Sequence, residues 1–418
     1  MRYFLLASIL CGIAAETLAD DPPLVPLRDG DRVVWLGGTF IERMQVDGYL
    51  ETLLTCRLPD RQVTFRNLGW SGDTVFGDAR GVFGGRREGY RRLIQDVNES
   101  QPTVIVVAYG SNESFAGKAG LDEFHRGLDR LLDDLAKTNA RLVLVTPYQF
   151  VKVGGYFADA EEANRRILLY RDAILKTAQY RELAVIDLYG EPWFGLTPDG
   201  QVVGTDNGMH PNEYGYWHTS FLLSRYFLAS PQPDPFQGNL SVTVDAAKEE
   251  VSVSGGKIDE LEFSAETLRW RLHADSLPWP PLPAAARALQ SRYGGGQRLR
   301  ITGLADGTYQ LLVDGNVLAT RSAAAFRDFQ LDQPGLPPTP DVARVNQLRN
   351  LIREKDELFF HRYRPQNETY LFLFRKHEQG NNAVEIPMFD PLIAEKEKQI
   401  AALAKPRPHI SELRHASK

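Results

Sequence analysis

Short apolar runs alternate with helix-like segments along the first half of the chain. The first run, VVWLGGTFIE at residues 33–42, indicates a strand that breaks into two glycines and Thr39 before helical sequence begins. Further strands are predicted at residues 63–67, 103–109, 141–146 and 184–188. The run at 103–109 has no polar alternation, which is typical of a strand that is buried on both faces of a parallel sheet.

Helical sequence fills the intervals between these strands. Helices are predicted at residues 49–58, 86–98, 121–137, 159–181 and 214–227. In the first of them the leucines recur at helical spacing. Strands that alternate with helices, each ending in a glycine-rich or polar loop, predict an α/β domain at residues 28–230. Its expected form is a three-layer, doubly wound, flavodoxin-like fold around five parallel strands.

The second half of the chain follows different patterns. Short alternating runs predict a small β-rich module at residues 238–332, with Asp314-Gly315 as a hairpin turn. A proline-rich stretch at 230–235 marks the boundary before this module. A helical arm follows at 338–405, and residues 406–418 are predicted to be a tail.

The helical arm carries an aromatic and charged insert between two amphipathic helices, at 342–357 and 392–404. Because two such helices need an apolar partner surface, we expect the insert to fold back over the candidate site of the α/β domain. The cluster Arg362-Tyr363-Arg364, with Asn367 and Glu368, indicates either a carbohydrate contact or a polar network at the surface or between domains. His377 has no second histidine at ligand spacing, so no metal site is expected there, and no cofactor is predicted.

Composition and charge narrow the class of partner. The net charge of -6 is spread along the chain, so a nucleic-acid partner is not expected. Residues 1–19 combine an early Arg2, a short apolar stretch and a small-residue ending, which is typical of a signal peptide and predicts a secreted or periplasmic protein. No later segment has the length of a membrane span. The oligomeric state stays open.

Candidate chemistry lies in the loops that follow the predicted strands. Thr39 follows the first strand, Ser71 and Gly72 the second, and Asn112 the third, while His210 precedes the last helix. The carboxyl ends of parallel strands share one edge of the sheet, so these groups are expected to meet there. A hydroxyl, a backbone donor, an amide and an imidazole are the parts that acyl transfer needs.

These blocks resemble those of the SGNH (GDSL-like) hydrolase family over about residues 28–230. The matching segments are Gly37-Gly38-Thr39-Phe40, the loop 67–74, Gly110-Ser111-Asn112-Glu113 and Asn207-Gly208-Met209-His210-Pro211. The resemblance implies that Gly72, Asn112 and the amide of Thr39 form an oxyanion hole and that His210 is the base. It also implies an O-acyl ester substrate. Together with the predicted export signal, the resemblance favours an acylated small molecule or glycan.

The sequence departs from the family at two catalytic positions. Thr39 stands where the family has its nucleophilic serine, and Asn207 stands where it has the aspartate behind the histidine. Either Asp206, one residue earlier, reaches His210, or the base is weak. Thr39 also has a non-catalytic interpretation, as a helix N-cap that forms a capping box with Glu42.

Three functions therefore remain open. The first is an esterase, and the second is a degenerate SGNH domain that binds a glycan or carboxylate without turning it over. The third is an assembly protein whose C-terminal helices bind another chain. Asp73 is expected either to shape its loop or to contact the substrate, and Glu113 is a candidate substrate contact.

Overall fold

A computed structural model describes residues 24–154, 159–191, 202–228, 239–264, 267–284, 286, 296–333, 335–378, 380 and 382–416. The predicted signal peptide and the boundary at 230–235 lie outside the described residues.

The α/β domain is built on an all-parallel five-stranded sheet of order β2-β1-β3-β4-β5, which confirms the predicted fold class. The strands are β1 (Arg32–Gly37), β2 (Thr64–Asn67), β3 (Val104–Ala108), β4 (Arg141–Val145) and β5 (Ala184–Ile186). The strand order reverses between β1 and β3. Open α/β sheets bind ligands beside such a reversal, outside the carboxyl ends of the strands.

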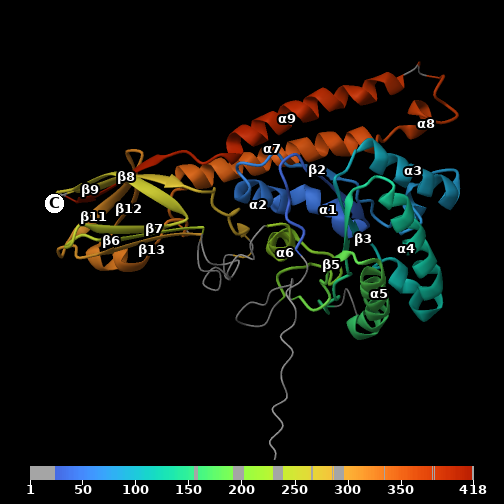
Figure 1. Ribbon diagram of the computed structural model, residues 1–418, viewed down its shortest axis with the longest axis horizontal. Coiled ribbons are helices and arrows are strands. Elements are labelled where there is room, and N and C mark those ends of the chain that lie inside the picture. Colours follow the sequence, from blue (N-terminus) through green and yellow to red (C-terminus); the bar gives the residue numbers. More distant parts are fainter. Residues whose placement is uncertain are drawn as a thin grey trace, which may run out of the picture.

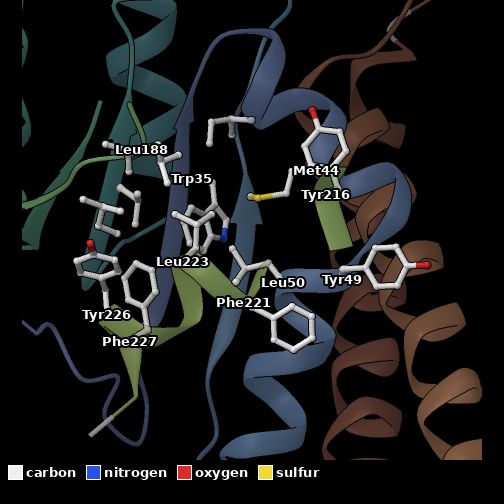
Figure 2. Packing of buried hydrophobic residues seen from close by; sticks show 14 of the residues in the cluster. Trp35, Met44, Tyr49, Leu50, Leu188, Tyr216, Phe221, Leu223, Tyr226 and Phe227 are labelled. Carbon is white, nitrogen blue, oxygen red and sulfur yellow. The ribbon is translucent and has the colours of Figure 1, made fainter. Parts of the chain in front are cut away.

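Helices cover both faces of this sheet (Figure 1). They are α1 (Thr39–Asp47), α2 (Tyr49–Arg57), α3 (Gly85–Glu99), α4 (Leu121–Ala136), α5 (Ala160–Arg181) and α6 (Glu213–Phe227), with the short helices η1 (Asp78–Arg80) and η2 (Glu113–Gly120). Trp35 packs with α1, α2 and α6 on one face, while its neighbour Leu36 packs with α3, α4 and α5 on the other. Figure 2 shows the first of these cores around Trp35, Leu50 and Phe227.

The β-rich module consists of two sheets with a shared apolar core. One has the order β13-β10-β6-β7, from β6 (Leu240–Asp245), β7 (Glu250–Ser254), β10 (Gln297–Thr302) and β13 (Phe329–Gln330). The other has the order β12-β11-β14-β9-β8, from β8 (Gly256–Phe263), β9 (Thr267–Ala274), β11 (Thr308–Val313), β12 (Asn316–Ser322) and β14 (His409–His415). A short helix, η4 (Ala323–Asp328), contributes Phe326 to the core.

The prediction of a tail at 406–418 is wrong for residues 409–415. These residues form β14, the middle strand of the five-stranded sheet, which pairs antiparallel with β9 and β11. Leu413 is almost fully buried in the core of the module, and this burial explains why the segment is ordered as a strand.

The helical arm leaves the module and returns to it. It contains α7 (Pro340–Tyr363), α8 (Glu368–Leu371), η5 (Asn382–Met388) and α9 (Phe389–Ala404). Figure 1 shows α7 running from the module along α2 and α1 towards α3, with α9 beside it. Lys355 of α7 is 1% exposed and forms an ion pair at 2.6 Å with Glu51 of α2, so a buried charge fixes the arm to the α/β domain. Among the described residues, no helix combines the length and apolarity that crossing a bilayer requires.

Candidate active site

Thr39 lies at the point where β1 ends and α1 begins. Gly38 is the N-cap residue and Thr39 is the first residue of the helix, with no side-chain cap. The capping-box interpretation of Thr39 is therefore wrong. The Glu42 carboxylate instead accepts hydrogen bonds from the backbone N–H and the hydroxyl of Ser71, at 2.6 and 3.0 Å. The Thr39 hydroxyl is left to face the loop after β2, where its Oγ1 lies 3.4 Å from the Gly72 nitrogen.

The predicted oxyanion donors come together around Thr39. Gly72 adopts a φ of 79°, which favours glycine, and its N–H is directed at the Thr39 hydroxyl. The Asn112 amide donates one hydrogen bond to the Asp73 carbonyl at 2.7 Å, and its second N–H has no acceptor among the described residues. The first backbone N–H groups of α1 lack intrahelical partners, so they add positive potential at the same place.

Asp73 supports this loop from inside the protein. Its carboxylate is fully buried and forms hydrogen bonds with Arg80 at 2.7 Å and with the Tyr109 hydroxyl at 2.8 Å. The prediction that Asp73 contacts substrate is thus not supported, because the side chains of Asp73 and Arg80 are both fully buried. Of its two interpretations, the loop-shaping one fits the structure.

Glu113 connects two loops of the site. Its carboxylate accepts hydrogen bonds from the backbone N–H groups of Val75 and Gly110, both at 2.9 Å. Glu113 therefore links the loop after β2 to the loop after β3. Burial raises the pKa of Glu113 to about 7, against the lowering effect of these N–H donors. Its oxygens are used within the protein, which makes Glu113 a supporting residue of the cleft rather than a direct substrate contact.

The base side of the cleft is organised by Asn207. Its Oδ1 accepts the backbone N–H groups of Met209 and His210 at 3.0 and 2.9 Å, and its Nδ2 lies 3.0 Å from Nδ1 of His210. Turning the amide over would set its N–H groups against those two backbone donors, so the amide orientation is fixed. Asn207 therefore donates to Nδ1, and the neutral imidazole carries its proton on Nε2.

Asp206 does not replace the missing carboxylate. Its side chain is exposed and accepts a hydrogen bond from Asn212 at 2.9 Å, while Asn207 occupies the position next to His210. The alternative in which Asp206 reaches His210 is contradicted. Burial, followed by the nearby charge of Arg43, lowers the pKa of His210, so the ring is held in its neutral form.

Thr39, Asp73, Asn112, Glu113 and His210 line one cleft of about 450 Å³, including the space that is open to solvent. The lining also includes aromatic residues, which the sequence patterns did not indicate: Phe40, Tyr109, Phe115, Tyr148 and Phe150. Tyr148 and Phe150 lie in the loop after β4. Because the carboxyl ends of parallel strands meet at one edge of the sheet, this position could have placed them in the cleft. Phe115 is 54% exposed and stands at the rim. Among the described residues, no group of three or more potential metal ligands is present.

Comparison with known proteins extends this description. Residues 43–218 match the model of the GDSL-like Lipase/Acylhydrolase family, a range that starts just after Thr39 and includes Asn112 and His210. No curated protein matches the chain. A gut microbial diltiazem-metabolizing enzyme has a similar structure, with 17% identity and a TM-score of 0.71, over 94% of this chain and 100% of its own.

Smaller structures resemble part of the chain. An acetylxylan esterase from Geobacillus stearothermophilus has 18% identity and a TM-score of 0.38, over 48% of this chain and 96% of its own. An alpha/beta hydrolase enzyme from the metagenome of Lake Arreo, Spain, has 19% identity and a TM-score of 0.37, over 47% of this chain and 94% of its own.

Proposed function

Because the α/β domain of this chain belongs to the GDSL-like lipase/acylhydrolase family, we propose that the protein is an esterase that hydrolyses O-acyl esters. The observation that supports this proposal is the meeting of a hydroxyl, oxyanion donors and an imidazole in one cleft. We further propose an acetyl or similarly small acyl group on a carbohydrate. The exposed ring of Phe115 at the rim offers an apolar surface for such a ligand.

The proposed reaction uses the cleft residues in turn. Thr39 Oγ1 attacks the ester carbonyl, and its proton passes to Nε2 of His210. The N–H groups of Gly72, Asn112 and Thr39 hold the negative charge that develops on the carbonyl oxygen. The alcohol leaves with the proton from His210. Water then attacks the acyl group on Thr39 and gives a proton to His210, which returns it to Thr39 Oγ1 as the acid leaves.

Asn207 makes this sequence slow. The favoured tautomer of His210 already has a proton on Nε2, so this nitrogen accepts the Thr39 proton only after the ring changes tautomer. The imidazolium also loses the carboxylate that would stabilise it. In the serine-protease example of the same Asp-to-Asn change, kcat falls by roughly four orders of magnitude. We therefore expect measurable but low esterase activity.

The direct test is hydrolysis of p-nitrophenyl acetate and of acetyl-xylan by the purified protein and by a His210→Ala variant. The esterase proposal predicts that the unaltered protein is faster than the variant on at least one of the two substrates. Equal rates on both would reject it. Mass spectrometry of the intact protein during turnover would detect an acyl group on Thr39.

A second function is favoured by the contact between Asn207 and His210. With the proton on Nε2, the imidazole joins the Gly72 and Asn112 N–H groups as a further donor at the cleft. Such a set of donors suits a carboxylate or an uncleaved acyl group. Calorimetric titration with acetate and with acetylated xylo-oligosaccharides tests this alternative, since binding that survives Thr39→Ala without any hydrolysis would support it.

We also propose that the protein is exported, on the basis of the signal-like residues 1–19. Sequencing the N-terminus of the protein recovered from its native host tests this directly. A mature N-terminus that begins close after residue 19 is expected, and an intact leader would contradict it.

A further inference from the structure

We propose that Arg364, at the end of α7, is a positioning residue for the oxyanion loop, which comprises residues 69–72. This inference rests on the proposed esterase function for its kinetic consequence, but its structural consequence does not depend on turnover. Arg364 lies outside the residues that match the family model. A positioning role for Arg364 would thus make the helical arm part of a site whose other residues come from the α/β domain.

The contact runs from the arm through one carboxylate to the loop. Arg364 donates to Oε2 of Glu42 at 2.7 Å, and the same oxygen accepts the backbone N–H of Ser71 at 2.6 Å. Glu42 Oε1 accepts the Ser71 hydroxyl at 3.0 Å. Ser71 immediately precedes Gly72, so a shift of the Glu42 carboxylate displaces the residue that supplies the predicted oxyanion N–H.

The arm grips the same loop at two further points. The guanidinium of Arg364 stacks on the Trp70 ring, with 3.9 Å between its central carbon and the ring centroid. The Tyr363 hydroxyl donates to the Gly69 carbonyl at 2.7 Å. Trp70 is 5% exposed and Tyr363 is 7% exposed, so these contacts are buried and little screened by water.

The loop has little room to adopt another position. A Cβ added to Gly69 would lie 2.2 Å from the backbone nitrogen of Glu42, because the loop backbone rests directly on α1. Arg364 and Glu42 are 29% and 20% exposed, respectively. The pair is thus partly shielded, and replacing one partner leaves the other charge poorly compensated. Of the two interpretations of the cluster Arg362-Tyr363-Arg364, the polar network between domains is the one that these contacts form.

The test compares full-length variants by hydrogen exchange and by kinetics. Arg364→Ala should accelerate exchange of the Ser71 and Gly72 amides and lower kcat by about ten- to a hundredfold with little change in KM, because misplacing a donor mainly affects the transition state. Arg364→Lys keeps the charge but not the planar stacking group, so it should restore part of both effects. Circular dichroism confirms that each variant is folded.

Arg362→Ala is the matched control. Arg362 precedes Arg364 by two residues but forms ion pairs with Asp390 and Glu99, away from the loop. It should leave both loop exchange and kcat unchanged. In addition, Arg364→Ala combined with Glu42→Gln should have a smaller effect than the sum of the two separate effects, because the two residues share one contact.

Hydrogen exchange separates failure of this inference from failure of the proposed function. If the unaltered protein hydrolyses no ester, the exchange rates of Ser71 and Gly72 still decide whether Arg364 positions the loop. Unchanged exchange in Arg364→Ala, or equal acceleration in Arg362→Ala, would overturn the inference. Faster exchange with unchanged kcat would show that the loop is loosened without catalytic effect, and this too would overturn the positioning role.

Discussion

The two sides of the cleft differ in how completely they are built. On the oxyanion side, Asn112 donates to the backbone carbonyl of Asp73, and the Asp73 carboxylate forms a buried ion pair with Arg80. On the base side, His210 is oriented by an amide that fixes the tautomer with its proton on Nε2. Under the proposed function, the groups that would bind an acyl group are thus built more completely than the groups that would move a proton.

The largest effect is expected from restoring the carboxylate on the base side. The carboxylate in Asn207→Asp would accept a hydrogen bond from Nδ1–H of His210. The ring would then carry its proton on Nδ1, which frees Nε2 to act as base, and the carboxylate would stabilise the imidazolium. We expect kcat for p-nitrophenyl acetate to rise by about three to four orders of magnitude. Asp206→Asn is the control and should leave kcat unchanged, since this side chain bonds only Asn212 among the described residues. If kcat of Asn207→Asp did not rise, the proposed contrast between the two sides of the cleft would be wrong.

A large loss of stability is expected on the oxyanion side. Asp73→Asn leaves Arg80, which is 1% exposed, without its main counter-charge. Breaking a buried ion pair in this way costs roughly 3–5 kcal/mol, measured as the free energy of unfolding in urea. Glu123→Gln removes one partner of an exposed ion pair with Arg86 and should cost less than about 1 kcal/mol. If Asp73→Asn lowered the free energy of unfolding no more than Glu123→Gln does, the buried ion pair would not stabilise this side of the cleft.

Removing a donor at the cleft should affect the rate more than the fold. Asn112→Ala is expected to lower kcat by about 10²–10³-fold, the usual cost of one oxyanion donor. Asn112→Asp has nearly the same size but no N–H to donate, so an equal loss in this variant would assign the effect to the missing hydrogen bond. Steady-state kinetics with p-nitrophenyl acetate decide the question, and an unchanged kcat in both variants would exclude Asn112 from the oxyanion hole.

The smallest effect concerns the pH dependence of stability. Burial raises the pKa of Glu113 to about 7 from its ordinary value of 4.5, so the folded protein binds this proton more tightly than the unfolded chain does. Its contribution to stability is complete below about pH 4.5 and is lost as the pH rises towards 7. Glu113→Gln cannot ionise, so its unfolding free energy should fall less between pH 5 and 8. Parallel pH profiles for both proteins would contradict this.

The architecture of the α/β domain and the position of the cleft could be predicted from local patterns. The run at 103–109 marks a central buried strand, and Thr39 and Asn112 follow strand ends. The role of Asn207 could not be predicted, because it depends on which backbone N–H groups occupy its carbonyl oxygen. Likewise, the burial of Asp73 depends on Arg80 and Tyr109, and no sequence spacing identifies such a three-way contact.

The module illustrates a second limit of sequence patterns. Residues 409–415 read HISELRH, in which Ile410 and Ser411 interrupt a clear alternation of apolar and polar positions. The strands that β14 joins lie far earlier in the chain, so neither its pairing nor its burial is encoded locally. The contact of Arg364 with Glu42 joins parts of the chain that are even more distant in sequence.

The late position of β14 also sets the order in which the protein is assembled during synthesis. The ribosome delivers the α/β domain first, then most of the module, then the helical arm and only afterwards the strand that lies between β9 and β11. Until residues 409–415 emerge, the inner edges of β9 and β11 stay unpaired, and such edges invite pairing with other chains. The module therefore reaches its final strand order only after β14 has been made, whereas α7 and α9 precede β14 in the chain and can already dock on a finished α/β domain.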